Sequence, residues 1–169
     1  MGSETLQFFP RKLKSADLLI DIGTAGSITL LLQSIIPAIA LSPINIKLKI
    51  KGGTDVSWSP SIDYFQNVFL DFVRRFASVQ LNVLRRGYYP AGGGEIELEI
   101  HGRELTAQLL VLKERGALQM VKGVANASSD LEAARVAERM AKAAEVICSS
   151  LKVPVNIRLE YSKTLCSGC

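Results

Sequence analysis

The sequence predicts an α+β protein, because stretches with strand-like alternation and stretches with helical periodicity follow one another along the chain. In residues 44–51 isoleucine and leucine alternate with lysine, and in residues 95–100 they alternate with glutamate. In residues 62–76 large apolar side chains recur at steps of three and four. Period two indicates half-buried strands, and the longer period indicates an amphipathic helix. The predicted order is a β-α-β-α-β-β layer, followed by a smaller and incomplete α+β unit.

Length and composition restrict the class of protein. The 169 residues can form one domain, or one domain and part of another. Hydrophobic residues make up 48% and charged residues 21%, which is typical of a core-forming protein and excludes a disordered chain. The net charge of +4 permits an anionic partner such as a nucleotide or RNA without requiring one.

Several sequence features indicate a cytoplasmic protein with no membrane partner. The most apolar window, residues 28–41, is interrupted by Pro37 and is too short to span a bilayer. The first residues lack the pattern of a signal peptide. Cys148, Cys166 and Cys169 are odd in number and lack the spacing of a disulfide framework, as expected in a reducing compartment.

The first half of the layer contains a buried strand and a buried helix. The strand, residues 18–22, is ended by Gly23. The helix, residues 25–40, is apolar around most of its circumference. Small and hydroxyl side chains at positions 23–27 can cap its start, and Pro37 should kink or end it.

The second half of the layer contains one helix and two strands around the same core. The helix follows Pro60, and its large apolar side chains are Ile62, Phe65, Phe69, Phe72 and Phe76. The strands are residues 79–84 and 95–100, and both helices should cover one face of the sheet. The lysines of residues 44–51 either pair with the glutamates of residues 95–100 across neighbouring strands, or both rows meet water.

The second unit is predicted from weaker patterns. Residues 105–112 and 117–124 resemble strands joined by a turn, residues 130–151 form the longest helix, and residues 153–161 form a last strand. The sheet of this unit should retain an unpaired edge, because no further element is predicted to cover it.

Residues 85–96 (RRGYYPAGGGEI) form an unusual connection between two predicted strands. It is longer than a common hairpin loop and contains three consecutive glycines, which lose much backbone entropy on ordering. It is either a flexible loop or backbone that must approach something closely.

Three other features have both a structural and a ligand-binding interpretation. The turn of residues 23–27 can cap a helix or hold a phosphate at its N-terminus. The amide of Gln33 can satisfy a buried backbone group or face a ligand. In the next loop Asp55 could help to hold a metal, and Trp58 or Pro60 could cover a base, or the loop could simply cap the following helix.

The remaining candidates favour structural roles. No Walker A sequence and no Gly-x-Gly-x-x-Gly pattern occurs. The only histidine, His101, ends a strand with no orienting partner nearby, which favours a surface position. Cys166 and Cys169 have Cys-x-x-Cys spacing, but no second pair completes a zinc site.

Taken in order, these motifs resemble the RNA 3′-terminal phosphate cyclase family. The similarity includes Gly-Thr-Ala-Gly-Ser at positions 23–27 with Gln33 downstream, and Gly-Gly-Thr-Asp at 52–55 with Ser59-Pro60. It is most specific in residues 86–96, which look like the signature of the family along their whole length, and it covers nearly the whole chain.

The resemblance implies an ATP-dependent enzyme. In the family a histidine attacks the α-phosphate of ATP, the adenylate passes to an RNA 3′-phosphate end, and the vicinal 2′-hydroxyl displaces AMP to form a 2′,3′-cyclic phosphate. A divalent metal, Mg²⁺ or Mn²⁺, normally supports the first step. By position, Gln33 resembles an ATP-contacting glutamine of the family, and Pro60 resembles a proline that packs on the adenine ring.

The departures from the family pattern imply a fragment. The opening segment of the family, with its nucleotide-contacting arginines, has no counterpart here, and the nucleophilic histidine belongs to a C-terminal region that this chain does not reach. His101 does not match it, so no catalytic residue and no metal ligand is assigned. Residues 1–112 would be one layer of the large cyclase domain and residues 113–169 part of its insert, inactive when isolated.

Two alternatives follow from the same resemblance. The family includes a cyclase-like branch without cyclase activity that acts in ribosome biogenesis or RNA binding, and the absent histidine region is where the branches separate. Unfinished sheet edges could also promote a homo-oligomer.

Overall fold

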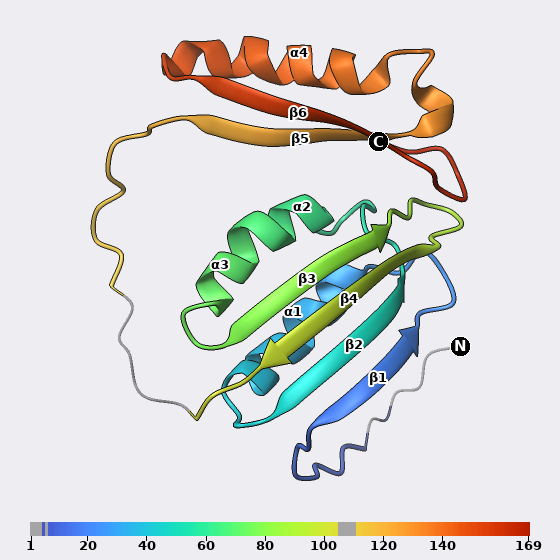
Figure 1. The fold of residues 1–169 in the computed structure, drawn as a ribbon, viewed down its shortest axis with the longest axis vertical. Helices are drawn as coiled ribbons and strands as arrows, with labels where there is room; N and C mark the ends of the chain where they lie inside the picture. The colour runs from blue at the N-terminus through green and yellow to red at the C-terminus, as the bar shows by residue number, and fades with distance from the viewer. Residues whose placement is uncertain (1–4, 6, 105–110) are drawn as a thin grey trace.

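The computed structural model describes residue 5, residues 7–104 and residues 111–169. Its strands form two sheets, one of four strands and one of two, each covered by helices (Figure 1). We call residues 16–101 the first unit and residues 121–169 the second unit. The α+β class predicted from the sequence is confirmed, and so is the β-α-β-α-β-β order of the first unit.

The sheet of the first unit brings three strand ends to one edge. Its strands are β1 (Ala16–Asp21), β2 (Asn45–Gly52), β3 (Ser78–Arg85) and β4 (Gly94–His101), in the spatial order β1-β2-β4-β3. β1 is parallel to β2, whereas β4 is antiparallel to both of its neighbours. The C-terminal ends of β1, β2 and β3 therefore lie at the same edge, next to the start of β4.

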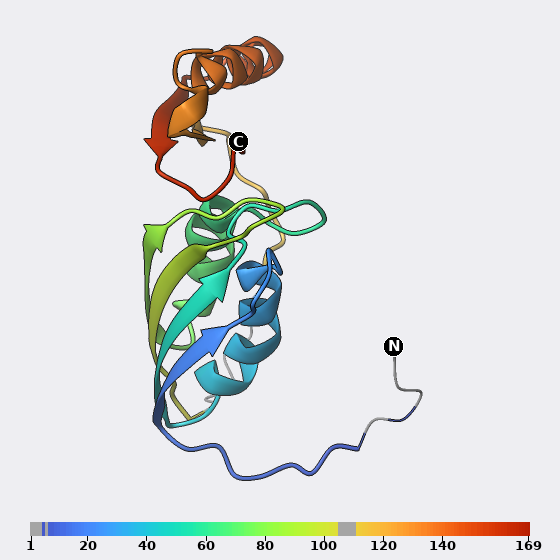
Figure 2. The ribbon, with the colours of Figure 1, turned by 90° about the vertical axis from the view of Figure 1, so that its right-hand side faces the viewer.

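Both helical segments cover one face of this sheet (Figure 2). They are α1 (Ile28–Ala40) and a second segment composed of α2 (Ile62–Tyr64), a π-helical turn (Phe65–Phe69) and α3 (Leu70–Val73). The buried core between helices and sheet includes Leu32, Ile36, Ile50, Phe65, Ile96 and Leu98. The predicted single-face packing is thus observed.

The opposite face of the sheet carries the lysine and glutamate rows, and the structure shows that the two rows pair with each other. β2 and β4 are neighbours, and their register places Lys47 opposite Glu99 and Lys51 opposite Glu95. Lys49 Nζ lies 2.9 Å from Glu95 Oε1. The hydrogen bond from Lys49 is the main reason that the pKa of Glu95 is lowered. The cross-strand interpretation is therefore the correct one.

The π-helical turn changes which side chains reach the core. The N–H of Leu70 donates to the carbonyl of Phe65, five residues earlier, so the turn contains one residue more than an α-helical turn. After it, Leu70 is fully buried whereas Phe72 is 43% exposed. The regular phenylalanine spacing predicted one continuous amphipathic helix, and the structure differs in this second half.

The start and the end of α1 follow from its caps and its proline. Ser27 is the N-cap, and its hydroxyl accepts the N–H of Leu30 at 3.2 Å. The helix continues through Pro37 to Ala40. Of the two expected effects of the proline, a kink or an end of the helix, the end is therefore not observed. Pro37 lacks an N–H group and cannot donate to the carbonyl of Gln33, one turn earlier.

The second unit is a β-α-β arrangement with a core of small side chains. Parallel strands β5 (Val121–Ser128) and β6 (Val155–Ser162) are connected through α4 (Val136–Cys148), which is flanked by short 3₁₀ turns. The buried cluster consists of Ala125, Ala127, Ala137 and Ala141. Within the part of the chain that the structure describes, each of the two strands has one unpaired edge, as predicted.

Two predicted strands of the second unit differ from the structure. Most of the strand expected at residues 105–112 lies outside the described residues, and residues 111–120 contain no helix or strand. The strand expected at residues 117–124 begins instead at Val121. None of the helices among the described residues has the length and apolarity needed to cross a bilayer.

Candidate functional site at the sheet edge

Three loops meet where β1, β2 and β3 end: residues 22–27, 53–61 and 86–93. Backbone hydrogen bonds join the first two, because Ile28 N donates to Gly53 O at 2.9 Å and Gly53 N donates to Gly26 O at 2.8 Å. Thr54 N donates to Gly87 O at 2.9 Å and so attaches the third loop. The motifs that the sequence singled out are therefore contiguous in space.

The glycine-rich loop packs tightly against its own chain. Gly92 has a φ of +66°, and a Cβ placed there would lie 2.7 Å from the carbonyl oxygen of Thr24. A Cβ at Gly87 would lie 2.2 Å from the backbone nitrogen of Gly94. Real Cβ atoms do not approach this closely, so these positions require glycine. Close backbone approach is the correct interpretation, and the partner is the chain itself.

Gln33 and Pro60 are brought to the same end of α1. Thr29 Oγ1 donates to the carbonyl of Pro60 at 2.8 Å and fixes the 53–61 loop against the first turn of the helix. Gln33 follows Thr29 by one turn on the same side of α1, and its Cα–Cβ bond points back toward the helix start. The Gln33 side chain is half-buried and has no hydrogen-bond partner among the described residues.

The turn of residues 23–27 uses its polar groups within the chain. Gly23 N donates to Asp21 Oδ1 at 2.8 Å, and Gly26 N donates to Thr24 Oγ1 at 3.2 Å. The first N–H of α1, that of Ile28, is taken by Gly53 O. These contacts favour the capping interpretation over phosphate binding at this helix start.

Asp55 holds its own loop and the helix that follows. Its carboxylate accepts the hydroxyl of Thr54 at 2.7 Å and the N–H of Ile62 at 3.3 Å. No group of three or more metal-ligating side chains is found among the described residues. Trp58, in the same loop, is fully exposed and has a φ of +66°.

Arg86 forms a charged junction that sequence reasoning missed. Its guanidinium binds Asp63 through two hydrogen bonds, reaches Asp55 Oδ2 at 3.3 Å, and reaches Glu160 Oε2 of β6 at 3.1 Å. Arg86 is only 7% exposed. Burial alone would lower its pKa, but the hydrogen bond to Asp63 and the charge of Asp55 outweigh burial and raise that pKa. No sequence spacing links these four positions, although Arg86 lies within the recognised motif.

Tyr88 forms a second junction between the two units. Its hydroxyl donates to Asn126 Oδ1, and Cys166 Sγ donates to its carbonyl at 3.2 Å. Gly168 packs against its ring, since a Cβ there would lie 2.2 Å from Cγ of Tyr88. The pKa of the Tyr88 hydroxyl is raised mainly by burial, and the charge of Asp55 raises it further.

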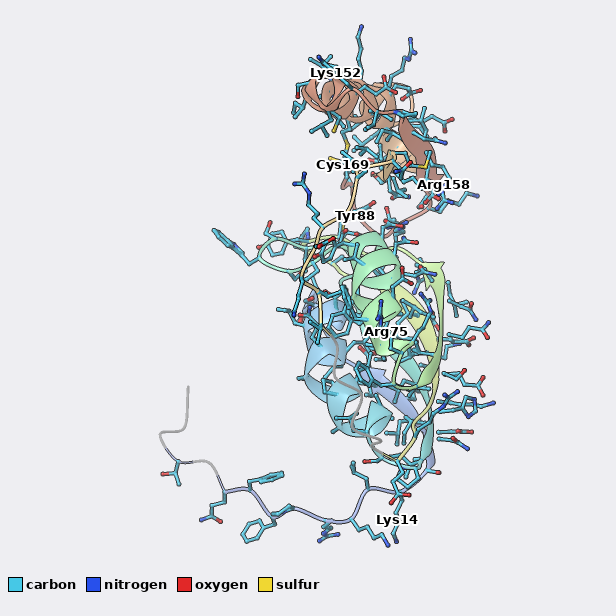
Figure 3. All side chains as sticks on the ribbon, turned by 90° about the vertical axis from the view of Figure 1, so that its left-hand side faces the viewer. Lys14, Arg75, Tyr88, Lys152, Arg158 and Cys169 are labelled. Atoms are coloured by element: carbon cyan, nitrogen blue, oxygen red, sulfur yellow. The ribbon has the colours of Figure 1, made fainter. Side chains whose placement is uncertain are left out.

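A cleft of about 410 Å³ opens between the 53–61 loop, the glycine-rich loop and the C-terminal residues. Figure 3 labels Tyr88 and Cys169, two of the residues that line it. Its lining is rich in hydroxyl groups and comprises Asp55, Val56, Ser57, Ser59, Ser61, Tyr88, Tyr89, Ser167, Gly168 and Cys169. Such a polar cleft with two tyrosines can hold a ribose or a base.

The other candidates lie elsewhere or have structural contacts. His101 ends β4 opposite the first residues of β2 and β3, which is the edge of the sheet away from the three loops. Its Nε2 lies 3.0 Å from Glu99 Oε1 on the surface. Cys166 and Cys169 are both free thiols.

Comparison with known proteins agrees with the motifs gathered at this edge. A family model described as RNA 3′-terminal phosphate cyclase matches residues 1–157. The RNA 3′-terminal phosphate cyclase of Pyrococcus abyssi is 41% identical over 169 residues, covering 99% of this chain and 48% of the relative. That of Saccharolobus islandicus is 41% identical over 163 residues, covering 95% and 46%. The chain thus spans about half the length of the curated relatives it matches. It belongs to the RNA 3′-terminal phosphate cyclase family.

Proposed function

We propose that this chain supplies part of the ATP site of an RNA 3′-terminal phosphate cyclase, an enzyme that converts an RNA 3′-phosphate into a 2′,3′-cyclic phosphate. The observation that carries the proposal is the hydrogen bond from Thr29 to the carbonyl of Pro60. It holds Pro60 beside the start of α1, one turn from the Gln33 amide, for which the described part of the chain offers no hydrogen-bond partner. An adenine ring against Pro60 would then have a polar contact within reach.

The adjacent cleft supports the same proposal. Ser59 and Ser61 flank Pro60 and line this cleft. The Ser59 hydroxyl donates to the carbonyl of Val56, and the Ser61 hydroxyl accepts the N–H of Tyr64, so the Ser61 hydroxyl proton is the one left for a ribose or a phosphate. When bound, ATP supplies an activated phosphate for nucleotidyl transfer. The described residues of this chain do not gather a metal-ligand set. A Mg²⁺ or Mn²⁺ ion, where it accompanies ATP, would offset the charge of the nucleotide phosphates.

Nucleotide binding is tested by titrating the chain with the fluorescent analogue mant-ATP. Gln33→Met keeps the volume of the side chain but removes its amide, and the affinity should fall about three- to tenfold, as for one lost hydrogen bond. Pro60→Ala should weaken binding similarly. Gln80→Met on the exposed sheet face is the matched control and should leave the affinity unchanged. If Gln33→Met and Pro60→Ala both bind like the wild type, the proposed site is wrong.

We further propose that the 169-residue chain does not itself accept the nucleotide covalently. His101 is the only histidine in the sequence and lies at the sheet edge away from the three loops. Incubation with α-labelled ATP and Mg²⁺ should leave no label on the protein. Label that survives denaturation and is lost in His101→Asn would overturn this part of the proposal.

The second candidate is a non-catalytic member of the family that acts in ribosome biogenesis or binds RNA. Nucleotide titration separates the two functions, because a pure binding protein has no need for the Gln33 and Pro60 contacts. Under either function, residues 1–112 and 113–169 would be one layer of the large domain and part of its insert.

A further inference from the structure

We propose that β1 is the docking edge for a second copy of this chain, so that two first units join their sheets through antiparallel β1 strands. β1 is an outer strand of the first sheet, and β2 is its one strand partner among the described residues. Figure 2 shows that residues 7–15 lead away from the sheet instead of running along β1. The outer edge of β1 is therefore available to another strand. This inference does not rest on the proposed nucleotide site.

The direction of the free backbone groups of β1 follows from its pairing with β2. The N–H of Ile22 donates to the carbonyl of Lys51 at 3.0 Å, so Ile22 directs its backbone groups toward β2. Because alternate residues of a strand direct these groups to opposite sides, Asp17, Leu19 and Asp21 direct theirs to the open edge. Within the described part of the chain, no hydrogen bond engages the backbone groups of these three residues at that edge.

The other edges of the two sheets are protected, which distinguishes β1 from them. The amide of Gln66 donates to the carbonyl of Leu81 on the open side of β3, at 3.3 Å, and the register of β3 with β4 is interrupted near its end. In the second unit, β5 and β6 each carry an exposed cation, Lys122 and Arg158. Blocked carbonyls, bulges and charged side chains are the usual means of preventing edge pairing. β1, in contrast, pairs with β2 in unbroken register over all six of its residues.

β1 also exposes apolar side chains that a second strand would cover. Leu18 points to the helix side of the sheet, since its register partner Leu48 belongs to the core. However, α1 packs over β2 and β4 and leaves Leu18 48% exposed. Leu19, on the opposite face, is 69% exposed. Pairing of two β1 strands would remove apolar area from water on both faces of the sheet, and this favours the association.

The side chains of β1 select one register for the two strands. A two-fold axis perpendicular to the sheet keeps both helix layers on the same face. With the axis at Leu18, Leu18 lies opposite its own copy, and Asp17 lies opposite Leu19 of the second copy. With the axis at Leu19, Asp17 would lie opposite Asp21 of the second copy, and like charges in this position are destabilising. An axis at Ile20 would pair side chains that are already partly buried. The expected register is therefore the one centred on Leu18.

The test is sedimentation velocity of the whole chain over about a hundredfold range of concentration. A strand pair of six residues is a small interface, so the wild type should form a dimer that dissociates on dilution. Leu18→Lys places two like charges opposite each other at the axis, and the dimer affinity should fall at least about fivefold. Leu84→Lys is the matched control, because Leu84 belongs to the other outer strand of the sheet and is 51% exposed. It should leave the dimer affinity unchanged.

A mixture of two variants tests whether β1 pairs with itself. Leu18→Glu should weaken the dimer as Leu18→Lys does, whereas an equimolar mixture of the two variants should recover it, because opposite charges then face each other at the axis. Urea denaturation of each variant distinguishes loss of the dimer from loss of the fold. A mixture that stays monomeric although both variants are folded would overturn the proposal.

Two further results would overturn the proposal without any variant mixture. A wild-type chain that is monomeric at every concentration would show that the edge of β1 does not pair with itself, and this measurement decides even where a variant fails to fold. A Leu18→Lys chain that dimerises as tightly as the wild type would place the interface on another surface, such as the exposed side of α1.

Discussion

Arg86 and Glu160 are separated by 74 positions in the sequence, and Nη2 of Arg86 lies 3.1 Å from Oε2 of Glu160. The same guanidinium binds Asp55 and Asp63, so one side chain joins the second loop, the helix after it and the second unit. When this buried cation is removed, Asp55 and Asp63 lose their charged partner, whereas Glu160 keeps its ion pair with Arg158.

Replacing Arg86 by methionine should therefore destabilise the chain strongly. Breaking a buried ion pair by removing one partner typically costs about 3–5 kcal/mol, and Arg86 is nearly buried. The free energy of unfolding, measured by urea denaturation, should fall by about 3 kcal/mol. Arg74→Met is the control, because its ion pair with Asp71 is exposed and should contribute no more than about 1 kcal/mol. Similar losses in the two variants would contradict the central role of Arg86.

Adding one methyl group to the glycine-rich loop should be more costly than its backbone conformation alone explains. Gly92 and Gly116 both have positive φ, but a Cβ at Gly116 would meet no atom within 4 Å. Gly116→Ala should therefore cost about 1 kcal/mol for the left-handed conformation. Gly92→Ala adds a clash with backbone atoms of Thr24 and Ala25 and should cost clearly more, seen as a lower Tm. Equal changes in Tm would show that the loop relaxes freely.

Local patterns in the sequence were sufficient to predict the strands of the first unit and the packing of its helices on one face of the sheet. The alternating lysines of residues 44–51 and glutamates of residues 95–100 defined two strands, whereas the glycine run left open whether it formed a flexible loop or closely packed backbone. Pairing between distant positions was not predictable, because no periodicity links Arg86 to Glu160 or Tyr88 to Asn126. The π-helical turn was not predicted either. The phenylalanines recur at the steps of a regular α-helix, and nothing in that sequence spacing indicates that one turn holds an additional residue.

Tyr88→Phe should change the dependence of stability on alkaline pH. Because the pKa of Tyr88 is raised in the folded chain, its contribution is complete below the unfolded value of 10.0 and is lost as pH rises above it. At pH 7 the variant should lose about 1 kcal/mol with the hydrogen bond to Asn126. Above pH 10 its free energy of unfolding should fall less steeply than that of the wild type.

Urea titrations between about pH 7 and about pH 11.5 measure both the loss of stability at neutral pH and its slope at alkaline pH, because this range includes the ordinary tyrosine pKa of about 10. Tyr64→Phe, at an exposed tyrosine, is the control and should leave the curve in place. A Tyr88→Phe curve parallel to that of the wild type at high pH would contradict the assignment.

Lys49→Gln should move the titration of Glu95. The hydrogen bond from Lys49 lowers the pKa of Glu95 below its ordinary value of 4.5. The hydrogen bond from Lys49 therefore stabilises the fold above pH 4.5, and this stabilisation is lost as the pH falls through the pKa of Glu95 in the folded chain. In the variant the pKa should rise toward 4.5, as followed by the ¹³C signal of the Glu95 carboxyl group. Lys47→Gln, whose ion pair is with Glu99, should not shift that signal.

The junction of Arg86 and Tyr88 with β6 and β5 has a consequence for how firmly the two units stay together. Both units belong to one chain, so separation of the Arg86–Glu160 contact leaves its partners at a high effective concentration. Reclosure is then an intramolecular event that costs no translational entropy. A transient break of the Arg86–Glu160 contact therefore does not release the two units from each other, because the chain still tethers them.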